Sequence, residues 1–96
     1  MKRNQTQSIG SLLHDFVRQN HMEQKLKEVD VLQYWPELIG PSLSHYIRGL
    51  HIEKKILYVD VTSSVARAEL YMLREEFRSR LNEKAGMEAI VKIVFR

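Results

Sequence analysis

Hydrophobic positions in the first third of the chain recur every three or four residues, the spacing of amphipathic helices. Two helices are therefore predicted before residue 36. The second begins near Asn20, whose side chain can form a capping box with Glu23, and it ends at Tyr34–Trp35 because a residue before proline avoids helical backbone. The first helix follows Ser8 as N-cap, and its apolar face consists of Ile9, Leu12, Leu13, Phe16 and Val17.

The pattern then changes to the spacing of strands. Tyr46–Ile52 and Ile56–Val61 are rich in β-branched and aromatic residues, and they predict a hairpin whose turn is Glu53–Lys55. In the second strand, apolar and polar positions alternate, so its two faces differ. One face carries Leu57, Val59 and Val61, and the other carries Tyr58 and Asp60.

A long amphipathic helix is predicted from Ser63–Ser64 to about Lys84, with Gly86 after its end and a last strand at Ile90–Phe95. Its apolar residues fall within roughly 80° on a helical wheel. They are Ala66, Leu70, Leu73, Phe77 and Leu81. The predicted order is α-α-β-β-α-β. The fold class is α+β, with helices on one face of a small three-stranded sheet.

Composition limits the chain to one domain. A chain of 96 residues is too short for two separate cores, so residues 1–7 are expected to fray before a single domain at 8–96. Hydrophobic residues at 44% and charged residues at 28% are typical of soluble proteins. No apolar run reaches the ~18 residues of a membrane span, and the start lacks a signal-type core. We therefore expect a cytoplasmic protein that has no membrane contact.

Signatures of catalysis, metals and cofactors are missing from the sequence. The absence of cysteine excludes disulfides and thiolate chemistry. The four glycines are isolated, the four histidines lack metal-ligand spacing, and Ser63 and Ser64 lack the glycines of a nucleophile elbow. We expect no enzyme activity, no metal and no cofactor, and the two serines are better explained as helix caps.

The net charge of +3 is too small to indicate a ligand, but its distribution is uneven. Residues 21–40 carry −2, so a positive patch must be assembled by folding from the other segments. Arg67, Arg74 and Arg78 lie within roughly 40° on the wheel of the long helix, with Tyr71 at the edge. Guanidinium groups beside an aromatic ring suit phosphates and bases.

Three features of the sequence have open interpretations. Lys54 and Lys55 would extend the arginine stripe if the hairpin tip lies nearby, although lysines are also common in turns. For the stripe itself, an ordinary solvated face is the default interpretation, because Glu75 lies one turn from Arg78 and charges of both signs are common on helices. Trp35, the one tryptophan, is either an anchor of the core or an exposed aromatic that binds a partner.

The order of short motifs resembles the DciA-like family of bacterial proteins over about residues 8–96. The motifs are Trp35-Pro36, Ile39-Gly40, His45, the run Leu57–Ser64, Ala66, Glu69-Leu70, Leu73, Leu81-Asn82, Gly86 and Ile93–Arg96. The resemblance implies a KH-related fold. It also implies association with the replicative helicase DnaB, whose loading the family assists, and with single-stranded or tailed DNA.

The resemblance thus implies a non-enzymatic accessory protein of DNA replication. No Gly-x-x-Gly clamp is present, so the usual KH grip on a nucleic-acid backbone is not carried over. An RNA-binding protein and a pure protein-interaction module are the alternatives. An exposed sheet edge would allow a weak homodimer as well as a monomer.

Overall fold

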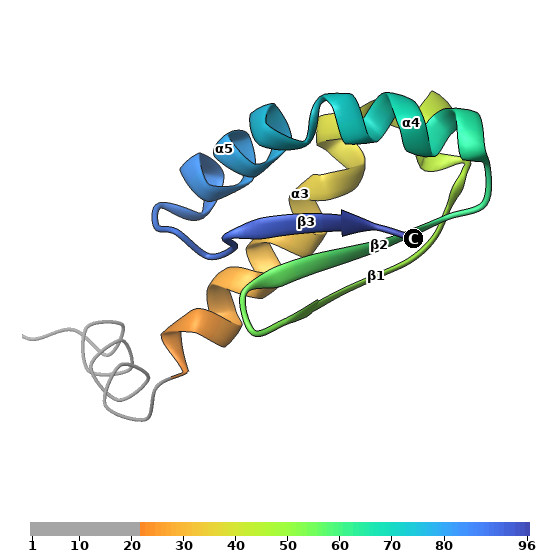
Figure 1. Cartoon of the computed structure of the whole chain (residues 1–96). Helices are drawn as coiled ribbons and strands as arrows, with labels where there is room; N and C mark the ends of the chain where they lie inside the picture. Colours follow the sequence, from red (N-terminus) through yellow and green to blue (C-terminus); the bar gives the residue numbers. More distant parts are fainter. Residues whose placement is uncertain (1–21) are drawn as a thin grey trace, which may run out of the picture.

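The computed structural model describes residues 22–96, which form three helices and three strands (Figure 1). In chain order they are α3 (Glu23–Ser44), β1 (Ile47–Glu53), β2 (Ile56–Val61), α4 (Ser64–Met72), α5 (Arg74–Ala85) and β3 (Lys92–Phe95). The predicted α+β class is confirmed. The helix predicted after Ser8 and the cap at Asn20 lie outside the described residues.

The sheet is mixed and has the order β1-β2-β3. The hairpin strands β1 and β2 are antiparallel, whereas β3 runs parallel to β2 after the chain has crossed over through α4 and α5. The three helices lie on one side of the sheet (Figure 1). Buried residues of β2 and β3, such as Leu57, Val59 and Ile93, pack in one core with residues of these helices. The helices thus cover one face of the sheet, as predicted.

The hairpin turn places two lysines in left-handed backbone. Lys54 has φ 53° and Lys55 has φ 65°, while Glu53 pairs with Ile56. Two consecutive positive φ angles between paired residues define a type I′ turn, which normally favours Asn-Gly. The predicted turn is therefore confirmed, but lysines are unusual at the two central positions of a type I′ turn.

The second predicted helix is longer than the sequence indicated. Pro36 was expected to end it, yet α3 continues through Pro36 to Ser44. The interruption lies at Gly40, where φ 84° and ψ 167° break the helical path. Such backbone is essentially restricted to glycine. The predicted boundary at Tyr34–Trp35 is wrong, because the packing of Trp35 in the core holds this part of the helix in place.

The long helix predicted from Ser63 to Lys84 is divided in two. Leu73 has φ −103° and ψ 11°, so α4 ends at Met72 and α5 begins at Arg74. The capping predictions are confirmed. The Ser63 hydroxyl accepts a hydrogen bond from the amide of Ala66 at 3.2 Å, and Gly86 closes α5 in left-handed backbone.

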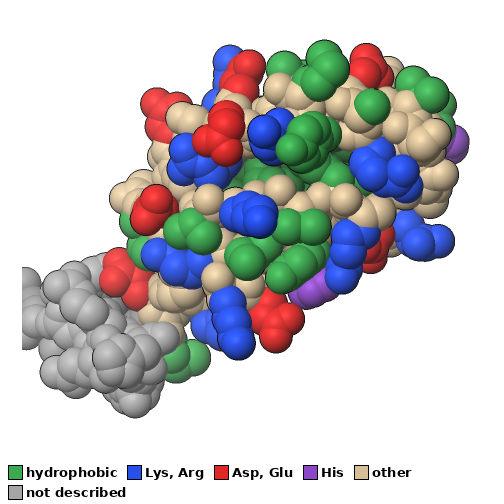
Figure 2. Space-filling model, in the orientation of Figure 1, with side chains coloured by type: hydrophobic (Ala, Val, Ile, Leu, Met, Phe, Trp, Pro, Cys, Tyr) green, Lys and Arg blue, Asp and Glu red, His purple; other side chains and the backbone are tan. Residues whose placement is uncertain are grey.

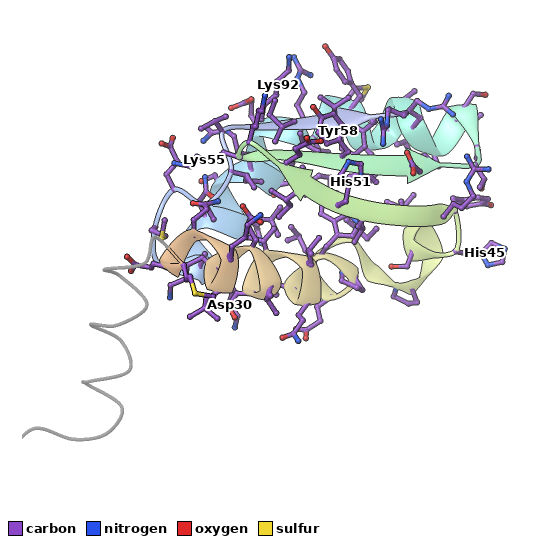
Figure 3. The ribbon with its side chains drawn as sticks, turned by 90° about the horizontal axis from the view of Figure 1, so that it is seen from below. Asp30, His45, His51, Lys55, Tyr58 and Lys92 are labelled. Carbon is purple, nitrogen blue, oxygen red and sulfur yellow. The ribbon has the colours of Figure 1, made fainter. Side chains whose placement is uncertain are left out.

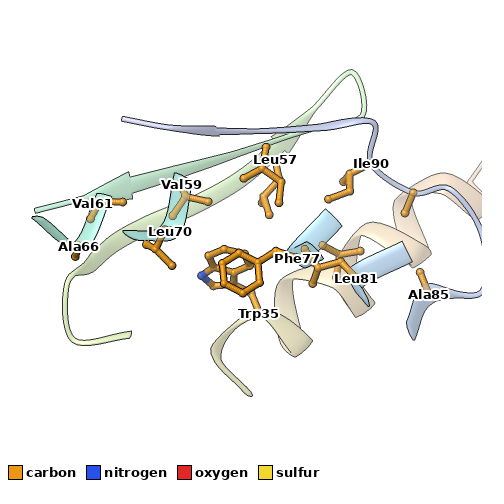
Figure 4. Close-up of a cluster of buried hydrophobic side chains, with 13 residues drawn as sticks. Trp35, Leu57, Val59, Val61, Ala66, Leu70, Phe77, Leu81, Ala85 and Ile90 are labelled. Carbon is orange, nitrogen blue, oxygen red and sulfur yellow. The ribbon is translucent and has the colours of Figure 1, made fainter. Parts of the chain in front are cut away.

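Trp35 is at the centre of the core, with 1% of its surface exposed (Figure 4). Its ring meets the edge of Phe77 at 5.5 Å between centroids and lies 6.2 Å from Phe95. It therefore joins α3 to α5 and β3. The interpretation as a core anchor holds, and the alternative of an exposed, partner-binding Trp35 is wrong because no partner can reach the side chain.

The segment between α5 and β3 is fastened by Asn82. Its carboxamide oxygen accepts from the amides of Ala89 (2.9 Å) and Ile90 (3.0 Å), and its nitrogen donates to the Ile90 carbonyl at 2.8 Å. Gln24 of α3 donates to the Ala89 carbonyl at 2.8 Å.

Within the described part of the chain, no helix is long and apolar enough to cross a membrane.

Candidate nucleic-acid interface

The arginine stripe predicted on one helix is shared between two. Arg67 and Tyr71 belong to α4, whereas Arg74 and Arg78 belong to α5, beyond the break at Leu73. The wheel assumed an unbroken helix, so its angles do not apply across residue 73. Tyr71 is exposed, and the three arginines are half-buried.

Each of the three arginines is engaged within the molecule. Arg67 donates to the carbonyl of Val61 at 2.9 Å, and its buried Nε has no partner among the described atoms. Arg74 donates to the carbonyl of Tyr71 at 2.8 Å, and its guanidinium lies 3.8 Å from the centre of that ring. Arg78 pairs with Glu75 at 3.0 Å. The stripe therefore offers few free donors to a ligand.

The cations without an internal partner lie mainly on the hairpin and the sheet. Of the ion pairs and ring contacts found in residues 22–96, none involves Arg48, Lys54, Lys55 or Lys92. The turn lysines and Lys92 are neighbours, since the amide of Val91 donates to the carbonyl of Lys55 at 2.7 Å. Lys54 and Lys55 thus form a basic end of the sheet together with Lys92, and they do not extend the arginine stripe.

The side of the sheet away from the helices, here called the outer face, carries basic, aromatic and apolar residues together with the carboxylates of Glu53 and Asp60. The register places Tyr58 opposite His51, and Lys92 beside Ile56. In Figure 2, Lys and Arg side chains lie among hydrophobic side chains across the strands. In Figure 3, Tyr58 and Lys92 lie on the side of the sheet that faces away from α3.

Three side chains on the outer face form a stack across the sheet. The rings of His51 and Tyr58 are nearly parallel, 15° apart in orientation and 4.9 Å between centroids. The Arg96 guanidinium lies 4.8 Å from the centre of the Tyr58 ring and is held by Asp60 at 3.2 Å. Gly49, which the register pairs with Asp60, adds no side chain beside this stack.

Sequence reasoning did not select the outer face, although one signal was present. The alternation in β2 put Tyr58 and Asp60 on the face opposite Val59. The cross-strand partner His51 and the contribution of Arg96 depend on register and on the parallel placement of β3. Neither follows from the spacing of residues along one strand.

The exposed side of α4 is largely apolar, with Glu69 as its charged residue. Val65 is 72% exposed and Met72 is 75% exposed, and they lie seven residues apart on one side of the helix with Ala68 between them. Hydrophobic side chains gather over this region at the upper right of Figure 2. Such a surface suits contact with another protein.

Two observations in residues 22–96 concern sites for a metal ion or a small ligand. No group of three His, Asp or Glu side chains in this range is arranged to hold a metal ion. The groove between α3 and α5 is open and polar, with opposite charges such as Glu76 and Arg80 paired at 3.2 Å.

The chain matches the model of a known family. Residues 8–95 match the family described as "Dna[CI] antecedent, DciA". No curated protein matches the chain. The match covers every described helix and strand, and it includes the motifs noted above except for Arg96.

Proposed function

The chain belongs to the DciA family, which is linked to loading of the DnaB helicase in replication, and we propose that it binds such a helicase and DNA. The observation that carries this proposal is the match over residues 8–95. The protein would act without catalysis, as a monomer or weak homodimer in the bacterial cytoplasm. Single-stranded or tailed DNA is the proposed nucleic acid, with RNA as the alternative.

The nucleic-acid part of the proposal is supported by the free cations of the described domain. Lys54 and Lys55 can contact phosphates without breaking an internal bond. Arg74 and Arg78 would first exchange the Tyr71 carbonyl and Glu75 for phosphate oxygens. We therefore expect the lysines to contribute more than the helical arginines, and Arg67 to act mainly in holding α4 to the end of β2.

A titration with single-stranded DNA tests this part. Fluorescence anisotropy of a labelled deoxythymidine 20-mer should show binding at low salt. The logarithm of the binding constant should then fall linearly with the logarithm of the salt concentration. The slope reports the number of phosphates contacted, about 0.7 per contact on a single strand. Absence of binding at low salt would refute the nucleic-acid part of the proposal.

The helicase part is tested separately by capture of a purified DnaB-type helicase after nuclease treatment. Retention of the helicase without nucleic acid would support direct docking. Loss of the helicase on nuclease treatment would show that DNA had bridged the two proteins and would refute direct docking.

The exposed apolar side of α4 favours a second candidate, a protein-interaction module that docks on the helicase without binding DNA. In that case the double variant Val65→Ser/Met72→Ser should lose helicase capture while remaining folded. Leu26→Ser on α3, which is also an exposed apolar position, is the matched control. Capture by the double variant at the wild-type level would exclude α4 as the docking surface.

A further inference from the structure

We propose that the outer face of the sheet is the surface that holds single-stranded DNA, with bases on the His51–Tyr58–Arg96 stack and phosphates on the lysines beside it. This inference rests on the proposed function, because it assigns a place to the DNA binding proposed there. It differs from the sequence-based expectation, which placed the DNA on the arginine stripe of the helices.

The first argument concerns which cations are available. Lys92 on β3 and Lys54 and Lys55 at the adjoining turn make no ion pair within residues 22–96. Arg78, in contrast, is paired with Glu75, and the guanidinium groups of Arg67 and Arg74 donate to backbone carbonyls. A phosphate therefore meets unpaired charge at the end of the sheet and engaged charge along the helices.

The second argument concerns the stack. Tyr58 on the central strand contacts the His51 ring from β1 and the Arg96 guanidinium from the end of β3, the strands on either side of it. The stack is thus already ordered, and its two ends are accessible, since His51 is exposed and the Arg96 side chain is 50% exposed. Imidazole rings and guanidinium planes both stack on nucleic-acid bases. A base added at either end continues a stack whose members are held in place.

The third argument is the arrangement of these groups along the strands. Lys92 and Arg96 are four residues apart and therefore on the same side of β3, one at each end of the strand. The stack crosses the sheet at Tyr58, beside Val94. Single-stranded DNA lying along β3 would meet a lysine at one end of this strand and the aromatic stack further on. Gly49 makes room beside the stack for the Asp60 carboxylate, which would lie 3.4 Å from a Cβ at this position.

Cross-strand stabilisation of the hairpin accounts for the His51–Tyr58 contact but leaves two observations unexplained. It does not require Lys92 to be free of a carboxylate partner. It also does not account for two lysines held in left-handed backbone at the turn, where glycine and asparagine are favoured. Phosphate binding at this end of the sheet explains both.

The test compares two lysines of the same chemistry with the labelled deoxythymidine 20-mer. Lys92→Gln removes a charge from the outer face, and Lys27→Gln removes one from α3; neither lysine has an ion-pair partner within residues 22–96. Lys92→Gln should reduce the salt slope by about 0.7, whereas Lys27→Gln should leave it unchanged. The double variant His51→Thr/Tyr58→Leu, which keeps strand-forming residues, should weaken binding about tenfold.

A second measurement does not depend on variants. Amide resonances of ¹⁵N-labelled wild-type protein, titrated with the same 20-mer, should shift in β2, β3 and the turn. Shifts confined to α4 and α5, or equal slopes for Lys92→Gln and Lys27→Gln, would overturn the inference while leaving DNA binding intact. Shifts of the outer face by the helicase but not by DNA would overturn it as well. Failure of the wild-type protein to bind the 20-mer would instead refute the nucleic-acid part of the proposed function.

Discussion

Replacing Asn82 by alanine is expected to detach the segment that leads into β3. The substitution removes three hydrogen bonds, two accepted from the amides of Ala89 and Ile90 and one donated to the Ile90 carbonyl. Ala89 and Ile90 have no exposed surface, so solvent does not take over these bonds in the folded state. The Ala89 amide keeps a second acceptor, the Met87 carbonyl at 2.8 Å, so the amide and the carbonyl of Ile90 are the groups left unpaired. An unpaired buried polar group costs about 1–3 kcal/mol, which gives an expected loss of about 2–6 kcal/mol for these two groups.

A loss of this size is a large part of the whole stability, which for a small domain is about 5–15 kcal/mol. Urea unfolding followed by the fluorescence of the one tryptophan, which is buried, measures the change directly. Glu83→Ala at the next, exposed position is the control, and it should change the free energy of unfolding by less than about 0.5 kcal/mol. A loss below about 1 kcal/mol for Asn82→Ala would refute the reasoning, since it would mean that Asn82 does not satisfy these groups.

Three other predictions concern backbone and core. Lys54→Asn/Lys55→Gly should raise the free energy of unfolding by about 1 kcal/mol, because asparagine and glycine suit the left-handed backbone of the turn. The same variant should weaken DNA binding. A urea midpoint below that of the wild type would contradict the expected gain in stability. Gly40→Ala should cost about 1–3 kcal/mol in the same assay through backbone strain alone, as nothing lies within 4 Å of the added methyl group; an unchanged midpoint would contradict it. Trp35→Ala should lower the free energy of unfolding by about 3–5 kcal/mol, as measured by calorimetry. A loss smaller than the one caused by Phe95→Leu would argue against the central place of Trp35 in the core.

The sequence predicted those features that depend on local chemistry. The hairpin, the Ser63 cap and the Gly86 cap follow from the preferences of single residues and from alternation, and all three are present. The break at Leu73 could not be predicted, because the apolar spacing from Leu70 to Phe77 keeps helical phase across it. The continuation of α3 beyond Pro36 also depends on tertiary packing.

The candidate site shows the same limit. A helical wheel can align Arg67, Arg74 and Arg78. It cannot show that each guanidinium group already interacts with a backbone carbonyl or a glutamate. The outer face combines β1, β2 and the end of the chain, which lie far apart in sequence. Its composition becomes visible only when the register of the strands is known.

The mixed topology of the sheet has a consequence for the order in which the molecule folds. The β1–β2 hairpin closes locally, whereas the parallel pairing of β3 with β2 closes a loop that includes both α4 and α5, so β3 is expected to join late. His51 and Tyr58 therefore come together early, and Lys92 and Arg96 are added last. A ligand on the outer face would bind only the completed sheet and would slow hydrogen exchange in β3, coupling the occupancy of this surface to the closure of the fold.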